Sequence, residues 1–154
     1  MSKDLRIRTF KDFVGELTAT YKRTSKPSIT VQNSKSVYDF IYPYFEECMD
    51  DHEEVKIIHF NRALNVVNVH MVGSGTDSAC LCDVKDVIRQ MLILKVHSFC
   101  LVHNHPTGRL VASQADKDLT MKLKAAGAYF DLKMLDSMIV SRESYYSFMD
   151  EGLL

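Results

Sequence analysis

The sequence predicts an α/β protein built on a mixed β-sheet that is flanked by helices. Two observations predict this class. Short apolar runs of strand type alternate along the chain with segments whose apolar residues recur at helical spacing. In addition, 46% of the 154 residues are hydrophobic and 25% are charged, an ordinary globular composition for a chain long enough to bury one core.

The chain is predicted to consist of an N-terminal arm, residues 1–32, and a core domain, residues 33–154. The spacing of apolar residues in the arm predicts an amphipathic helix over residues 9–22. The residues that carry this spacing are Phe10, Phe13, Val14 and Leu17. A basic turn follows at residues 21–26, and because it holds only three cations we interpret it as a solvated connector. A short strand is expected at residues 28–31.

The first half of the core domain is expected to contain two helices and a hairpin. Ser34 or Ser36 can cap the first helix, and Pro43 should kink it or divide it in two. Two strand-like runs, residues 55–60 and 66–72, are joined by a short loop and predict a hairpin. Asp83 then caps a second helix with one apolar stripe. The residues of this stripe are Val84, Val87, Ile88, Met91 and Leu92.

An apolar strand, residues 96–102, runs directly into two histidines, His103 and His105. Alternate residues of an extended chain share a face, so both imidazoles can point toward one place. Pro106 cannot donate a hydrogen bond to a strand ladder, and Gly108 tolerates unusual backbone angles. We therefore expect the strand to end here and a loop to begin.

The next helix is predicted to begin at Ser113, because a serine followed three residues later by the acidic Asp116 forms a helix cap. The carboxylate of Asp116 would then point back toward the end of the preceding strand. Gly127 is the expected end of this helix. A strand over residues 132–140, interrupted at its centre by an Asp-Ser pair, and a short strand or turn at residues 145–148 complete the domain.

A catalytic zinc ion is typically held by two imidazoles and one carboxylate, which His103, His105 and Asp116 can supply. We expect one zinc ion per chain. A structural zinc site would normally use four ligands, several of them cysteines. Two plainer interpretations exist. The Ser113–Asp116 pair is also a helix cap, which does not compete with metal binding. The histidines could be ordinary loop residues, but the complete set of residues favours a metal site.

The whole chain excludes several other classes of protein. Its net charge of −1 provides no general basic field for wrapping nucleic acid, and no apolar run approaches the length of a membrane span. The N-terminus carries no signal-peptide core, so we expect a cytoplasmic protein with free thiols. These thiols are Cys48, Cys80, Cys82 and Cys100. The remaining histidines are expected to be satisfied core or edge residues, and they include His59, His70 and His97.

The order His-x-His-x7-Ser-x2-Asp resembles the signature of the JAMM (MPN-type) metalloproteases. Most of the chain, from about residue 28 to residue 154, is similar to the RadC family of bacterial JAMM-type proteins, which are often labelled DNA repair proteins. Four stretches carry this likeness: residues 53–65, 83–86, 101–108 and 145–154. The resemblance implies a JAMM/MPN-like fold, related to the cytidine-deaminase architecture, with His103, His105 and Asp116 binding zinc. Two residues depart from the family pattern: Thr107 replaces a serine, and Ser137 replaces a histidine expected near the site.

A zinc hydrolase also needs a general base beside its water molecule. In JAMM enzymes this base is a glutamate from an early strand, and the candidates here are Glu53 and Glu54. Side-chain alternation does not separate the two, whereas counting back from Asn61 in the RadC pattern favours Glu53. The hydroxyl of Ser113 would then help to hold the oxyanion. The implied reaction is hydrolysis of an amide or isopeptide bond in a peptide or protein substrate.

Other functions compete with a zinc peptidase. The first is a non-catalytic binding or scaffold protein of the same fold, associated with DNA repair or mobile elements, although only the family label suggests nucleic acid. Exposed strand edges or the N-terminal helix could support a homodimer. A zinc nucleobase deaminase is disfavoured, because that chemistry expects a His-x-Glu motif followed by a Cys-x-x-Cys motif. Here the residue two positions after His103 is His105, and the chain contains no Cys-x-x-Cys.

Overall fold

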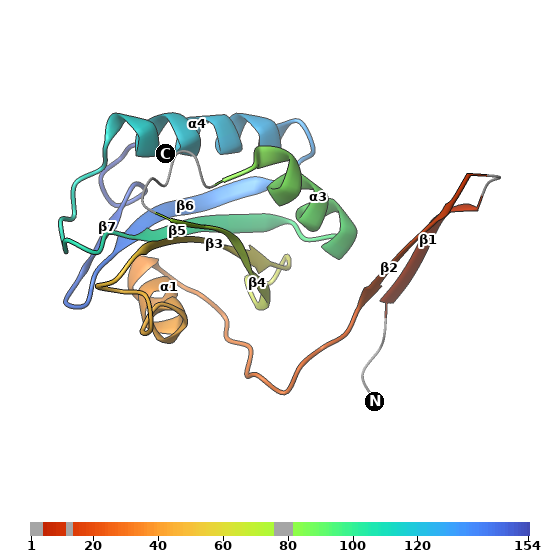
Figure 1. Cartoon of the computed structure of the whole chain (residues 1–154), viewed down its shortest axis with the longest axis horizontal. Helices are drawn as coiled ribbons and strands as arrows, with labels where there is room; N and C mark the ends of the chain where they lie inside the picture. The colour runs from red at the N-terminus through yellow and green to blue at the C-terminus, as the bar shows by residue number, and fades with distance from the viewer. Residues whose placement is uncertain (1–4, 12–13, 76–81) are drawn as a thin grey trace.

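The structure, a computed structural model, describes residues 5–11, 14–75 and 82–154. Its main feature is a mixed sheet with the strand order β4-β3-β5-β6-β7 (Figure 1). Strands β5 and β6 are parallel, and the other neighbouring pairs are antiparallel. This sheet confirms the predicted α/β class and the predicted hairpin. The strands are β3 Glu53–Phe60, β4 Val66–Gly75, β5 Ser98–Asn104, β6 Lys133–Val140 and β7 Tyr145–Ser147.

Helices cover both faces of this sheet. Helix α1, Ser34–Ile41, lies on one face, and helices α3, Val84–Leu94, and α4, Gln114–Ala128, lie on the other (Figure 1). Each face has its own core cluster. Ile58 and Val102 belong to the cluster beside α1, whereas Val55, Ile57 and Leu101 belong to the cluster beside α3 and α4. All residues of β5 are buried, because this strand occupies the centre of the sheet and is covered on both sides.

Local sequence signals explain where the helices begin. Asn33 caps α1, and its side chain accepts a hydrogen bond from the backbone N–H of Ser36. The cap therefore lies before both predicted positions, Ser34 and Ser36. Pro43 lies in a short 3₁₀ turn after α1, Tyr42–Tyr44, and divides this region in two as predicted. Asp83 caps α3 as expected. Among the described residues, no helix is long and apolar enough to cross a membrane.

The predicted helix over residues 9–22 is wrong. The described part of this segment forms two antiparallel strands, β1 Leu5–Lys11 and β2 Glu16–Tyr21, which stand apart from the sheet (Figure 1). The segment is rich in threonine and aromatic residues, which favour strands, and Gly15 lies before the second strand. Helical spacing of four apolar residues was a weaker signal than this composition. The division of the chain at residue 32 stays a prediction.

Three further details differ from expectation. Gly127 lies inside α4 instead of ending it, and a Cβ atom at this position would approach the carbonyl oxygen of Leu132 to 2.9 Å. The glycine therefore permits close packing of the helix. Strand β6 is continuous through Asp136, whose buried carboxylate accepts hydrogen bonds from Ser147 and from the backbone of Met149. Finally, Leu92 of the predicted apolar stripe is exposed.

Candidate metal centre

The first two residues of the centre come from the end of the central strand. His103 of β5 lies opposite Val55 of β3, and Val55 packs in the core cluster beside α3 and α4. The His103 side chain is buried on this same side of the sheet. The chain then turns sharply, since the N–H of Gly108 donates to the carbonyl of His105 at 2.8 Å. Gly108 adopts a φ of +75°, which favours glycine.

The third residue comes from the first turn of α4. The Ser113 hydroxyl accepts a hydrogen bond from the Asp116 N–H at 3.1 Å, and the Asp116 carboxylate accepts one from the Ser113 N–H at 2.7 Å. This reciprocal capping box is the predicted helix start. It also orients the Asp116 carboxylate, whose side chain is 1% exposed, toward the end of β5.

The three side chains converge. His103 Nε2 lies 3.1 Å from Asp116 Oδ1, and His105 Nε2 lies 3.6 Å from Asp116 Oδ2. The two Nε2 atoms are 3.1 Å apart. One donor atom from each residue lies within 4.8 Å of the others, as in a site that can hold a metal ion. The structure therefore brings together all three metal ligands that the sequence predicts.

Hydrogen bonds and neighbouring charges set the tautomer of His105 and the charge of Asp116. His105 Nδ1 lies 2.8 Å from the backbone carbonyl of Arg109, which only accepts hydrogen bonds. This contact assigns the proton of the neutral ring to Nδ1 and leaves the Nε2 lone pair facing the cluster. Burial disfavours the charged form of Asp116, but hydrogen bonds from His103 and His105 outweigh this effect and hold its pKa well below the usual range. The neighbouring carboxylate of Asp116 in turn raises the pKa of His105.

Of the two candidate general bases, only Glu53 lies beside the centre. Glu53 Oε1 is 3.9 Å from His105 Nε2, and Glu53 Oε2 is buried without a hydrogen-bond partner among the described residues. Glu54 points to the opposite face of the sheet and pairs with Lys56 and His52. The Lys56 ammonium lies over the ring of Phe45 in the cluster beside α1. Successive side chains of β3 point to opposite faces of the sheet, and the metal ligands lie on only one of these faces. Glu53 therefore points to the metal ligands, and Glu54 points away from them.

Asn104 is a further residue of the site, and its function was missed by sequence reasoning. Its side-chain amide donates to the backbone carbonyls of Cys48, Met49 and His52 at 2.9–3.2 Å. Its side-chain oxygen accepts from the N–H of Glu54 at 2.8 Å. Asn104 therefore ties the turn before β3 to the strand that carries the histidines. Its partners lie about fifty residues away in sequence, so no local pattern could have identified them.

The two departures from the RadC pattern occupy different surroundings. Ser137 is buried and lies 2.8 Å from the hydroxyl of Thr120, one helical turn along α4 from Asp116. Thr107 lines an open cleft of about 520 Å³ beside the centre. Other residues that line this cleft are His52, Glu53, His105, Arg109 and Ser113. The centre thus lies beside an open cleft, and Glu53 and His105 form part of its wall.

None of the three described cysteines belongs to this centre. Cys48, Cys82 and Cys100 are free thiols, as predicted, whereas Cys80 lies outside the described residues. The other histidines were predicted to have satisfied hydrogen-bonding groups, and this is confirmed for His70 but not for His59. His70 Nε2 lies 3.0 Å from Asp86, but His59 is fully buried and neither of its ring nitrogens has a partner in the part of the chain that the structure describes.

Comparison with known proteins agrees with this geometry. A family model described as the RadC-like JAB domain matches residues 31–153. A UPF0758 protein of Flavobacterium johnsoniae is 35% identical over 123 residues, which cover 80% of this chain and 53% of that protein. A UPF0758 protein of Thermotoga maritima is 35% identical over 115 residues, covering 74% of this chain and 52% of that protein. This chain therefore spans about half the length of these relatives.

Proposed function

Because this chain belongs to the RadC-like JAB-domain family and brings two histidines and an aspartate together, we propose that it is a zinc-dependent metallopeptidase or isopeptidase. One observation carries the proposal. The cluster of His103, His105 and Asp116 lies beside Glu53, whose buried carboxylate oxygen has no partner among the described residues. Three protein ligands with an adjacent carboxylate are the arrangement of a catalytic zinc site, whereas structural sites use four ligands.

The residues present fit a zinc ion. His103 and His105 would bind it through Nε2 and Asp116 through its carboxylate, and the Arg109 carbonyl would keep the His105 ring in the required tautomer. A zinc ion held there would supply Lewis-acid chemistry, which acidifies water and polarises an amide carbonyl.

The protein's own groups would then move the protons. Glu53 would accept a proton from the attacking water and return it to the nitrogen of the leaving amine. The Ser113 oxygen accepts the helix-cap hydrogen bond, which leaves its hydroxyl hydrogen to donate toward the developing oxyanion. The cleft lined by Glu53, Thr107 and Ser113 would receive the peptide or protein substrate.

A non-catalytic scaffold is the second candidate function. The observation that favours it is Ser137, which hydrogen-bonds to Thr120 close to the site where the family pattern places a histidine. This alternative retains the metal ion but predicts no turnover of any amide substrate.

Metal analysis is the first test of the proposed function. Protein purified without chelators and without a polyhistidine tag would be examined by mass spectrometry for bound metal. We expect about one zinc ion per chain in the natural protein and none in a His103→Ala/His105→Ala variant. A His97→Ala variant is the matched control, because His97 is an exposed histidine outside the centre. Absence of bound metal, even after addition of zinc and dialysis, would rule out the hydrolase mechanism.

Screening of peptide and isopeptide substrates would follow, with Glu53→Gln as the reference. The peptidase proposal expects turnover that this substitution abolishes while the zinc content is unchanged. Zinc binding with equal, background hydrolysis by the natural protein and the Glu53→Gln variant across the screen would instead favour the scaffold.

A further inference from the structure

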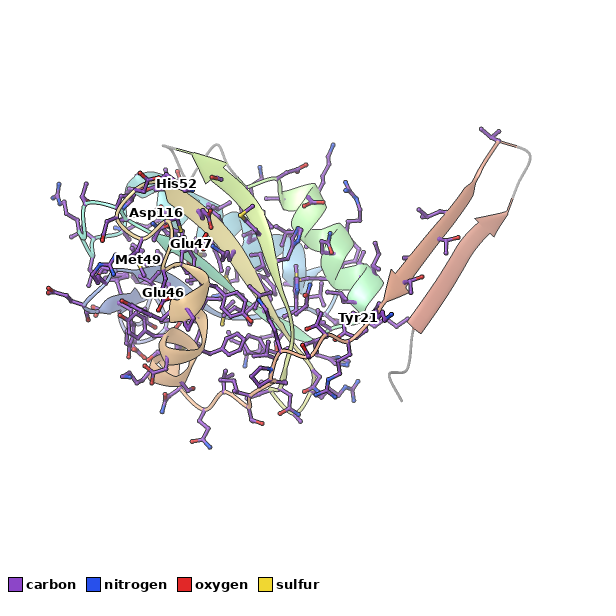
Figure 2. All side chains as sticks on the ribbon, turned by 60° about the horizontal axis from the view of Figure 1, so that its bottom comes forward. Tyr21, Glu46, Glu47, Met49, His52 and Asp116 are labelled. Carbon is purple, nitrogen blue, oxygen red and sulfur yellow. The ribbon has the colours of Figure 1, made fainter. Side chains whose placement is uncertain are left out.

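A second groove lies at the opposite end of the β3–β4 hairpin from the metal centre. It is about 970 Å³ in volume and is lined by the N-terminal arm, the end of α1 and its following turn, and the first residues of β4. Figure 2 shows Tyr21 of this groove far from His52 and Asp116, which mark the metal centre. The groove and the cleft at the metal centre share no lining residue.

The charge of this groove differs from that of the whole chain. Lys22, Arg23 and Lys26 line it, and its described lining includes no aspartate or glutamate. The chain as a whole carries a net charge of −1, so the three cations create a local positive field that the overall composition conceals. This field favours an anionic ligand.

Aromatic rings lie among these cations. Phe40 and Tyr44 are half-buried neighbours with ring centroids 5.5 Å apart, and both line the groove. The Lys26 ammonium lies 4.9 Å from the centre of the Tyr44 ring. The Tyr21 hydroxyl donates to the Val67 carbonyl at 2.9 Å, which holds the arm against the edge of β4. The fold therefore places Lys26 of the basic turn over the ring of Tyr44, which lies beside the ring of Phe40.

Cations together with accessible rings are the features with which proteins bind single-stranded nucleic acid. The cations follow the phosphates, and the rings stack against the bases without regard to their sequence. An acidic peptide would use the same cations but would not require the rings. The rings of Phe40 and Tyr44 in the lining therefore favour single-stranded nucleic acid over an acidic peptide.

We propose that this groove is a binding site for single-stranded nucleic acid. Its phosphates contact Lys22, Arg23 and Lys26, and its bases stack against Phe40 and Tyr44. The site is independent of the proposed peptidase activity, because it involves neither the metal ligands nor Glu53. The residues interpreted from sequence as a solvated connector become the phosphate-binding side of the site.

Fluorescence anisotropy of a labelled oligothymidylate, titrated with the full chain at several salt concentrations, tests this proposal. A Lys22→Gln/Arg23→Gln/Lys26→Gln variant should weaken binding at least tenfold and reduce the salt slope by about 2, as expected for three lost phosphate contacts. The matched control is Lys117→Gln/Lys122→Gln/Lys124→Gln, which removes the same charge from α4 and should leave binding nearly unchanged.

Stacking is tested separately with Tyr44→Leu and Phe40→Leu, each checked for an unaltered thermal unfolding transition. Loss of a stacked base should weaken oligothymidylate binding roughly 5- to 150-fold in at least one of these variants while poly-glutamate binding is unchanged. Three results would overturn the proposal: no binding of the oligonucleotide, an equal effect of the α4 control variant, or binding of poly-glutamate as tightly as oligothymidylate with no effect of either ring substitution.

Discussion

Asn104 accepts a hydrogen bond from the backbone N–H of Glu54 at 2.8 Å, and this contact joins the ends of β5 and β3. The histidines and the candidate base lie on these two strands. Because Glu53 immediately precedes the bonded residue, the position of its carboxylate beside His105 depends on a side chain of the adjacent strand. A buried amide that satisfies four backbone groups is also a large contribution to stability.

Substitution Asn104→Ala should therefore destabilise the protein. It leaves buried backbone groups of the turn before β3 without partners, at a cost of about 2–4 kcal/mol. Urea unfolding of the natural protein and the variant measures this difference. A loss below about 0.5 kcal/mol would show that water replaces the amide and that the turn does not depend on Asn104.

The two glutamates at the start of β3 should behave in opposite ways. Glu53→Gln should leave the unfolding free energy and zinc content nearly unchanged but reduce any amide hydrolysis by about 100-fold or more, because it removes the proton acceptor. Glu54→Gln should retain hydrolysis and lower stability, because the buried Lys56 loses its charged partner. Parallel measurement of turnover and urea unfolding in both variants tests this assignment. Equal turnover in Glu53→Gln and the natural protein would exclude Glu53 as the base.

Removal of metal should lower the thermal stability of the natural protein. A ligand present at 100 times its dissociation constant stabilises the folded state by about 2.7 kcal/mol, and a chelator would remove that contribution. The unfolding temperature, measured by calorimetry with and without chelator, should fall for the natural protein. It should not change for the His103→Ala/His105→Ala variant, and an equal fall in both proteins would place the relevant metal elsewhere.

Buried His59 should make the protein sensitive to acid. Burial, together with the nearby His70, lowers the pKa of His59 from 6.5 to about 3. Between pH 6.5 and pH 3, His59 is protonated in the unfolded chain but neutral in the folded protein. The contribution of His59 to stability is therefore fully present above pH 6.5 and is lost progressively as the pH falls toward 3. Between pH 7 and pH 5 this residue should cost about 2 kcal/mol.

Replacement of His59 by phenylalanine, which cannot be protonated, isolates this effect. The variant should lose about 2 kcal/mol less than the natural protein between pH 7 and pH 5 in urea unfolding experiments, whatever its absolute stability. The exposed His97→Ala variant is the control and should keep the natural pH dependence. Identical pH profiles for natural protein and His59→Phe would show that His59 is protonated without penalty in the folded state.

Much of the fold and the metal ligand set could be read from sequence, because both depend on local spacing. The serine cap at Ser113 determines where α4 begins and hence where Asp116 lies in its first turn. The alternation of an extended strand determines that His103 and His105 can share a face. By contrast, the helical spacing in residues 9–22 led to a wrong prediction, because a short apolar pattern is compatible with a helix and with a strand almost equally well.

Only the tertiary structure decided the remaining features. Both faces of β3 are buried, so its sequence offers no polar side to separate Glu53 from Glu54, and the choice depends on which face α4 covers. The hydrogen-bond partners of Asn104 and the ring beside Lys26 likewise come from other segments of the chain, and no local sequence pattern links them. By itself the sequence determined elements and ligand spacing, since these follow from neighbouring residues. The packing of distant segments decided which side chains meet, since that depends on the whole core.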